Sequence, residues 1–217
     1  MRSLHLVVRD VRDLLLPREC VGCGGCGLWL CRSCLDSLDR TPESRWLGGA
    51  GERIRLTHAA PYEGVAAAAV LAYKERGLRS IADVLAALAV RAARGSGGEF
   101  GCDPPCVVPV PATWQARLRR GGDTWLRVCR QAFPCAGVGD VSPALRWAGW
   151  VQPQKTLDKD ARGRNVRGQL AVKPGWTGPG RVIVVDDVVT TGATVLEAAR
   201  ALRLAGWDVE GAAAICG

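Results

Sequence analysis

Hydrophobic and polar positions alternate along this chain in blocks that predict strands and helices in turn. Arg181 to Val185 is a short run of mostly β-branched apolar residues, the pattern of a strand buried on both faces of a parallel sheet. Val195 to Arg203 then carries apolar residues at helical spacing, and Trp207 to Ile215 predicts a closing strand. Arg53 to Tyr62 and Cys106 to Pro111 are further candidate strands.

Helical patterns separate these strands. Val65 to Arg76 and Leu78 to Arg94 are alanine-rich, and Leu4 to Leu16 predicts an amphipathic helix. Strands that alternate with helices favour an α/β fold with a parallel sheet flanked by helices. The 217 residues leave room for one such domain at residues 53–217 and a small N-terminal unit at residues 1–52. Within that unit, residues 35–51 are polar and interrupted by Gly and Pro, which predicts a linker.

Polar chemistry gathers where the Arg181 strand ends. Ligands of α/β sheets bind at the carboxyl ends of the strands, and the start of a helix offers backbone N–H groups to an anion. The hydroxyls of Thr190, Thr191 and Thr194 add donors, and Gly192 allows close approach of the backbone. This loop suits a phosphate monoester. Asp186 and Asp187 would repel that phosphate, so they are expected on another part of the ligand, where adjacent acceptors suit a vicinal diol.

Three other interpretations of this stretch account for less of it. A buried strand followed by an ordinary capped helix accounts for one acid and one hydroxyl, but not for two acids and three threonines. A Walker-type loop is excluded because no Gly-Lys-Ser/Thr follows a glycine-rich turn. A phosphatase metal site on Asp186 and Asp187 would need further carboxylates, for which Asp123 is the one plausible candidate.

Five of the ten cysteines fall within fifteen residues. Cys20, Cys23, Cys31 and Cys34 form two C-x2-C pairs, the spacing of two knuckles that close a tetrahedral zinc site. Four thiolates leave no open coordination position, so the metal is expected to be structural. Cys26 is surplus and leaves a Cys23/Cys26 pairing open. A redox role for the pairs is the rival interpretation.

Basic residues are candidates for a second anionic group. Lys74 lies in a predicted helix, and Arg119 and Arg120 follow the Pro109–Pro111 turn, which ends a predicted strand. The turn is expected in the same crevice as the Asp186 strand, where guanidinium groups suit a pyrophosphate. A solvated basic face is the alternative. Further along, the polar segment of residues 152–165 predicts a functional loop or a lid.

Charge and composition change this picture little. The net charge of +8, carried by 25 Arg and 4 Lys, favours an anionic ligand or nucleic acid, although GC-rich coding would also make Arg abundant, together with Ala and Gly. Charges interrupt residues 4–16, so no export signal is expected there. No apolar run reaches the roughly 20 residues that span a bilayer. A cytoplasmic protein is therefore expected.

The order of these motifs resembles a known family. A hydrophobic strand, Asp-Asp and Thr-Thr-Gly-x-Thr resemble the PRPP-binding signature of type I phosphoribosyltransferases, and the cysteine pairs with Pro-Val-Pro resemble the ComF family of predicted phosphoribosyltransferases linked to DNA uptake in competent bacteria. The resemblance covers nearly the full length. It departs from the family's aromatic-Asn pair at Gly122-Asp123, which would put an acid near the pyrophosphate, and Cys26 lies outside the four-cysteine pattern.

The resemblance implies roles for individual residues. Asp186 and Asp187 would hold the ribose diol, and the loop would wrap the 5-phosphate, with Mg²⁺ bridging pyrophosphate and ribose oxygens. Pro109, Val110 and Pro111 would form the pyrophosphate turn, with Lys74, Arg119 and Arg120 on that side. Gln154, Arg162 and Asn165 would belong to a flexible catalytic loop. The residues expected around the 5-phosphate are Val188, Thr190, Thr191, Gly192, Ala193 and Thr194.

Two functions follow as expectations. The first is transfer of ribose 5-phosphate from PRPP to a nitrogen nucleophile, with release of pyrophosphate. The second is a non-catalytic factor of the competence machinery that binds single-stranded DNA and retains a PRPP site, which the positive charge, the zinc site and the eight tryptophans favour. The tryptophans are scattered and are not interleaved with basic residues, which weakens the second.

Overall fold

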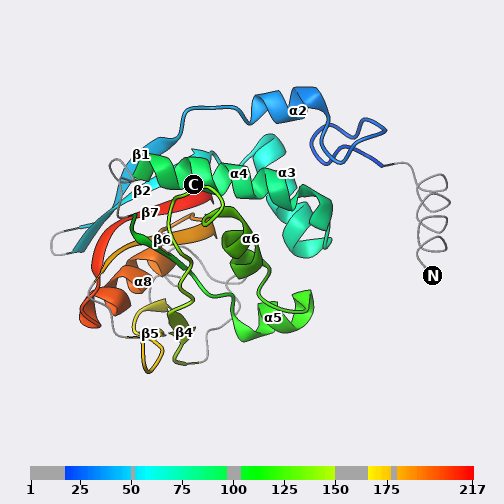
Figure 1. The fold of residues 1–217 in the computed structure, drawn as a ribbon. Helices are drawn as coiled ribbons and strands as arrows, with labels where there is room; N and C mark the ends of the chain where they lie inside the picture. The colour runs from blue at the N-terminus through cyan, green and yellow to red at the C-terminus, as the bar shows by residue number, and fades with distance from the viewer. Residues whose placement is uncertain (1–17, 50–51, 97–103, 150–165, 177–179) are drawn as a thin grey trace.

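A five-stranded sheet with the strand order β1-β2-β7-β6-β3 forms the centre of the fold (Figure 1). The structure, a computed structural model, describes residues 18–49, 52–96, 104–149, 166–176 and 180–217. The strands of this sheet are β1 (Glu43–Gly49), β2 (Glu52–Ala60), β3 (Cys106–Pro109), β6 (Arg181–Val188) and β7 (Asp208–Cys216). β2, β7, β6 and β3 are parallel, and β1 is an antiparallel edge strand. The predicted α/β class is confirmed.

Helices cover both faces of the sheet. α3 (Gly64–Glu75), α4 (Ala82–Ser96) and α6 (Thr124–Ala132) share one core, and α8 (Ala193–Leu204) packs in the other (Figure 1). Strand β6 contributes side chains to both cores, because successive side chains of a strand point to opposite faces of the sheet. Ile183 and Val185 belong to the α3 side, and Val182 and Val184 to the α8 side. All four are buried, as the continuous apolar run predicts.

Parallel pairing brings the carboxyl ends of four strands to one edge. Pro109 at the end of β3 lies opposite Val185 in β6, and Cys216 at the end of β7 lies opposite Val188. Ala60 of β2 also pairs with Cys216. The loops that follow β3 and β6, and helix α3 that follows β2, therefore start from the same edge.

The cysteine segment packs against α3 and α4. Cys20, Cys34 and Leu38 are buried in the core that these helices share with the sheet. The segment ends in the short helix α2 (Arg32–Ser37). A Cβ placed on Gly22 would lie 3.0 Å from a methyl group of Val65 at the start of α3, so the first knuckle and α3 are in close contact.

Two features differ from the predictions. The predicted linker at residues 35–51 is wrong for Glu43–Gly49, which forms β1 and pairs with β2 along its length. Only Leu47 of β1 is buried, so the strand leaves little apolar pattern in the sequence. The predicted boundary after residue 52 falls at the start of β2, and the division into two units stays a prediction.

The second difference is a small two-stranded sheet of β4 (Leu145–Trp147) and β5 (Leu170–Val172), in a region without a strand prediction. The buried Glu197 of α8 accepts a hydrogen bond from the Leu170 N–H at 3.2 Å and fixes β5 to the main domain. No helix in the described residues is both long enough and apolar enough to cross a membrane.

Candidate functional site

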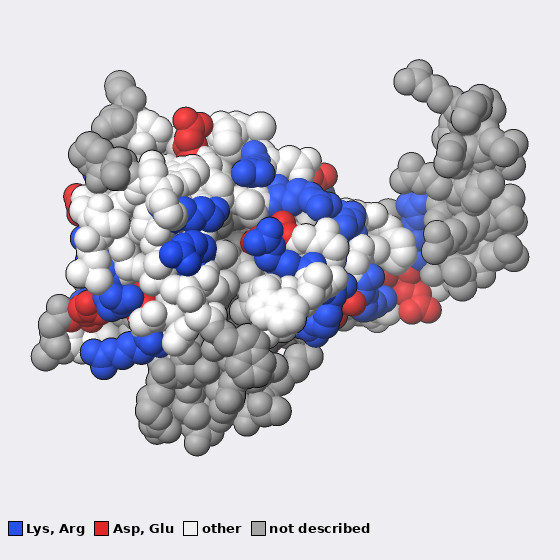
Figure 2. Space-filling view, turned by 90° about the horizontal axis from the view of Figure 1, so that it is seen from below, with Lys and Arg blue, Asp and Glu red and all other residues white. Residues whose placement is uncertain are grey.

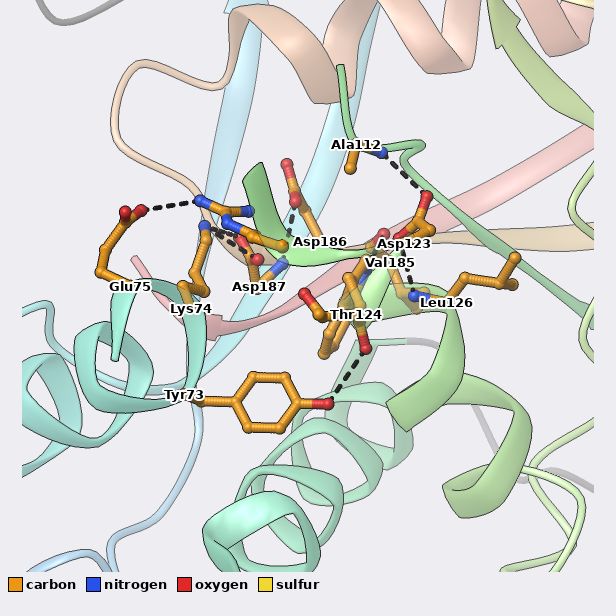
Figure 3. A network of polar contacts seen from close by, with 12 residues as sticks. Tyr73, Lys74, Glu75, Ala112, Asp123, Thr124, Leu126, Val185, Asp186 and Asp187 are labelled. Atoms are coloured by element: carbon orange, nitrogen blue, oxygen red, sulfur yellow. Dashed lines mark hydrogen bonds and ion pairs between the residues drawn. The ribbon is translucent and has the colours of Figure 1, made fainter. Parts of the chain in front are cut away.

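The acidic pair lies at the carboxyl end of β6, as predicted. Both side chains are partly buried, and the Asp187 N–H donates to Oδ1 of Asp186 at 2.8 Å. Both oxygens of Asp187 lie 2.9 Å from Nζ of Lys74 (Figure 3). Lys74 reaches them from α3, so the ion pair joins this helix to β6. The structure thus brings together three residues that the sequence predicted separately.

Burial and charge act on these groups in opposite directions. Desolvation, followed by the neighbouring Asp187 charge, raises the pKa of Asp186 well above its ordinary value. For Lys74, desolvation by itself would lower the pKa, but the Asp187 and Asp186 carboxylates outweigh it and raise the pKa. Lys74 therefore stays charged at neutral pH, whereas Asp186 is held nearer to protonation.

The threonine loop encloses a small hollow. Gly192 adopts φ +80° as the N-cap residue of α8, and no acidic residue lies in the first turn of this helix. Asp186 and residues 188–195 line a hollow of about 40 Å³. None of these lining residues is basic. Because the start of a helix carries partial positive charge and N–H groups without partners in the helix itself, this hollow suits an anion of phosphate size.

Strand β1 supports this loop, which the sequence did not indicate. Nη2 of Arg45 donates to the carbonyl oxygens of Val189 (3.2 Å) and Thr190 (3.1 Å). Leu47 packs beneath the turn, and a Cβ on Gly192 would lie 2.7 Å from its Cδ1 atom. No local signal marks Arg45 or Leu47, because their role depends on pairing of β1 across the sheet.

The Pro109–Pro111 turn borders the acidic pair, but its amide groups are already used. Neither proline has an N–H, and the Val110 N–H donates to the Val185 carbonyl at 2.9 Å. The next amide, of Ala112, donates to Oδ2 of Asp123 at 3.1 Å (Figure 3). The turn from 109 to 112 therefore offers no unpaired backbone donor.

Asp123, the acid that the sequence places near the expected pyrophosphate, has a structural role. Its Oδ1 accepts from the Leu126 N–H at 3.0 Å and caps α6, while its other oxygen holds Ala112. The carboxylate thus fixes the turn to α6. In the described residues, moreover, the cysteine cluster is the only group of three or more potential ligands that could hold a metal. A metal centre built from Asp186, Asp187 and Asp123 is not supported.

Arginines on α5 (Trp114–Arg120) face the end of α3. Nη2 of Arg120 lies 2.8 Å from Glu75, and Nη1 of Arg119 lies 3.8 Å from the same carboxylate. The predicted pyrophosphate-side cations Arg119 and Arg120 therefore lie against the end of α3 and line one cavity with Lys74. A separate cavity of about 300 Å³ borders the Pro109–Pro111 turn, with Arg117 and Trp147 in its wall.

The predicted loop residues Gln154, Arg162 and Asn165 lie outside the described residues. In the sequence these residues lie between β4 and β5. Nε1 of Trp147 in β4 donates to the Pro111 carbonyl at 2.9 Å. Strand β4 is thus attached to the turn beside the acidic pair.

The four predicted zinc ligands come together. The sulfur atoms of Cys20, Cys23, Cys31 and Cys34 all lie within 4.8 Å of one another, and Cys26 is not among them. A hydrogen bond from the Cys31 N–H to Cys20 Sγ (3.3 Å) is the main reason that the pKa of Cys20 falls to about 6. The hydrogen bond with Cys31, together with burial, raises the pKa of Cys34 to about 12, so a metal would displace that proton. Four thiol donors at this separation fit a tetrahedral zinc ion.

Comparisons with known proteins found similarity to phosphoribosyltransferases. No family model matches the chain. The chain is 32% identical over 103 residues to the orotate phosphoribosyltransferase of Bacillus caldolyticus, which is 43% of this chain and 47% of that protein. It is 31% identical over 96 residues to the enzyme of the same name from Halalkalibacterium halodurans (41% and 45%) and 42% identical over 99 residues to that of Lactiplantibacillus plantarum (41% and 44%). The chain thus spans less than half of each relative.

A solved structure also matches. It is the crystal structure of adenine phosphoribosyltransferase from Rhodothermus marinus, with 16% identity, a TM-score of 0.35, and coverage of 84% of this chain and 85% of the other. By sequence, the chain is similar to phosphoribosyltransferases, which agrees with the signature at residues 186–194.

Replacing Asp186 should stabilise the unliganded protein in a pH-dependent way. The pKa of Asp186 is higher in the folded state than in the unfolded state. At pH values above the ordinary aspartate pKa, the folded state therefore binds more protons than the unfolded state, and the free energy of unfolding falls as the pH rises. Asp186→Asn removes that cost, so we expect a gain of about 1 kcal/mol at pH 8 and almost none near pH 3. Urea denaturation across this pH range measures it, with the exposed Asp208→Asn as control. An equal gain at both pH values would contradict the assignment.

The contact of Gly192 with Leu47 is testable with a glycine of the same backbone angle. Gly175 also has φ +80°, but a Cβ there would meet nothing within 4 Å. Gly192→Ala and Gly175→Ala should therefore share the strain of a left-handed residue, and Gly192→Ala should cost about 1–2 kcal/mol more. Leu47→Ala combined with Gly192→Ala should recover part of this difference. Equal losses of unfolding free energy for the two glycines would show that the loop is not packed on β1.

The cysteine cluster predicts one zinc ion per chain. Cys34→Ser and Cys23→Ser should each reduce bound zinc at least tenfold and lower the melting temperature, because a structural site contributes its binding energy to folding. Cys26→Ser is the matched control and should keep zinc and stability. Metal analysis by mass spectrometry and thermal unfolding give the two readouts. Loss of zinc in Cys26→Ser with retention in Cys23→Ser would favour the alternative pairing.

Proposed function

We propose that this protein binds PRPP and transfers its ribose 5-phosphate to a nitrogen nucleophile, with release of pyrophosphate. The observation that carries the proposal is the convergence, at one edge of the sheet, of an acidic pair and a phosphate-sized hollow at the start of a helix. A diol and a phosphate are the two ends of a ribose 5-phosphate. Sequence similarity to three orotate phosphoribosyltransferases supports the same class.

Each group has a role in this proposal. The loop from Thr190 to Thr194 binds the 5-phosphate through backbone N–H groups and hydroxyls. Asp186 and Asp187 bind the ribose 2- and 3-hydroxyls, and Lys74 places a positive charge beside the pyrophosphate. The C1–O bond to pyrophosphate breaks as the nitrogen of the acceptor bonds to C1 and then loses its proton. Mg²⁺, when bound with the phosphates, supplies further charge neutralisation.

Electrostatics accounts for how the acidic pair would assist the reaction. As the C1–O bond breaks, positive charge develops on the ribose ring, and carboxylates held in place before the reaction stabilise it. Asp187 is fixed by Lys74 and Asp186 is fixed by the Asp187 N–H. The protein thus contributes mainly positioning and charge, without a covalent intermediate.

The cysteine cluster and the positive charge bear on the type of protein and on a second ligand. The ComF type is supported by the cysteine cluster together with the Pro-Val-Pro turn, and a structural zinc ion fits the four thiols. Single-stranded DNA is a second candidate ligand. The net charge of +8 and the exposed Trp46 and Trp114 support it, but these rings lie on separate elements, β1 and α5. The PRPP site is therefore the stronger candidate. A cytoplasmic location remains a prediction.

Thermal unfolding with ligands tests the function. PRPP with Mg²⁺ at 100 times its dissociation constant should stabilise the folded wild type by about 2.7 kcal/mol. For a chain of this size that is roughly 5–10 °C in melting temperature. The double variant Asp186→Asn/Asp187→Asn should lose the shift, while Asp208→Asn keeps it. Pyrophosphate release with a panel of bases then tests turnover.

The same assay contains the result that would reject the proposal. A folded, zinc-containing wild type that shows no shift with PRPP or with ribose 5-phosphate does not have this site. A shift with an oligothymidine under those conditions would move single-stranded DNA to first place.

A further inference from the structure

The turn at Pro109–Pro111 does not supply the donors that a pyrophosphate needs. Every N–H from residue 109 to 112 is either absent or bonded within the protein, and Asp123 holds the last of them. A pyrophosphate carries several negative charges and is bound by N–H donors or cationic side chains. Those donors must come from elsewhere near the acidic pair.

A basic cavity lies beside Lys74. It has a volume of about 220 Å³ and lies between the C-terminal end of α3 and the arginines of α5. Five of its lining residues are basic and Glu75 is its one acid. The basic residues are Lys74, Arg76, Arg79, Arg119 and Arg120. On the face shown in Figure 2, Lys and Arg side chains are spread across the centre, while most acids lie toward the margins.

Glu75 forms ion pairs with two of the cations in this cavity. Its carboxylate is 2.8 Å from Arg120 and 3.8 Å from Arg119. The Arg120 side chain is only 14% exposed, and its Nε atom is buried without a hydrogen-bond partner in the described structure. A guanidinium with an unmet buried donor is incompletely satisfied by Glu75 alone. An anion with several oxygens would satisfy it better.

We propose that this cavity binds the pyrophosphate group of the ligand, with Glu75 as an internal counter-anion that the pyrophosphate displaces. The inference rests on the proposed function. It assigns pyrophosphate recognition to Arg76, Arg79 and Arg120, together with Lys74. The Pro109–Pro111 turn lines the other cavity and has no part in it. A ligand must displace the negative charge of Glu75 from the cations of the cavity. A compound with two adjacent phosphates carries more charge than one with a single phosphate, so it should bind here more tightly.

Because the Glu75 carboxylate competes with the ligand, removing its charge should increase the affinity for pyrophosphate. Glu75→Gln keeps an oxygen that accepts from Arg120 but removes the negative charge. Magnesium pyrophosphate should bind this variant roughly three- to tenfold more tightly, the size expected for one partly exposed charge near an anion. Arg79→Gln and Arg120→Gln should each weaken it by about tenfold. Titration calorimetry at two salt concentrations measures the constants.

Two controls separate this inference from general charge effects. Asp83→Asn removes an exposed acid at the start of α4 and should leave pyrophosphate affinity unchanged. Arg117→Gln removes a cation from the other cavity, which borders the turn, and should also leave it unchanged. Weaker pyrophosphate binding in Glu75→Gln would mean that Glu75 positions Arg120, which overturns the proposal. If Arg117→Gln loses affinity for pyrophosphate and Arg79→Gln does not, pyrophosphate binds at the Pro109–Pro111 turn and the proposal is wrong.

Ribose 5-phosphate separates failure of this inference from failure of the proposed function. It lacks the pyrophosphate, so its affinity should not differ between wild type, Glu75→Gln and Arg79→Gln. If the wild type binds ribose 5-phosphate but pyrophosphate affinity is the same in all variants, the cavity assignment alone is wrong. If the wild type binds neither compound, the proposed function is wrong as well.

Discussion

The ion pair between Lys74 and Asp187 is the interaction on which the arrangement of the site depends. It joins residues 113 positions apart in the chain and fixes the end of α3 to the end of β6. Lys74 is 23% exposed and Asp187 is 16% exposed, so solvent screens the pair much less than it would a surface pair. The helix that brings Lys74 also brings Glu75 and, through it, the arginines of α5. One partly buried pair thus sets the distance between the acidic pair and the basic cavity.

The small N-terminal unit is part of this arrangement. It contacts α3 through Gly22 and Val65, and its chain continues into β1, where Arg45 and Leu47 hold the threonine loop. The cysteine cluster therefore lies next to one support of the site and shortly before the other in sequence. A metal that orders this segment would stabilise both supports, because folding and metal binding are coupled.

The site also illustrates a conflict between stability and function. Asp186 is placed beside a second carboxylate in surroundings that disfavour its charge. Arg120 keeps a buried donor without a partner. In a domain selected for stability alone, such groups would be replaced or fully paired. Their presence at one edge of an otherwise closely packed sheet is a physical indication that a polar, charged ligand belongs there.

The sequence by itself determined the parts of the protein that depend on local pattern. The β-branched run at 181–185, the alanine-rich helices and the acidic pair followed by a threonine loop predicted β6, α3, α4, α8 and the candidate site, because periodicity and residue type suffice for these. The spacing of Cys20, Cys23, Cys31 and Cys34 likewise predicted the four-cysteine cluster.

Only the tertiary structure decided which of these groups meet. Strand β1 is nearly all exposed and has no apolar pattern of its own, so pairing with β2 alone reveals that Arg45 supports the loop. The one N–H of the Pro109–Pro111 turn donates to Val185, far along the chain, and Asp123 proved to be a cap and not a metal ligand. For Arg45 and for the turn the physical reason is the same: hydrogen bonds between distant segments leave no periodic trace in a sequence. The cap by Asp123 is local, but its residue type alone does not distinguish a helix cap from a metal ligand.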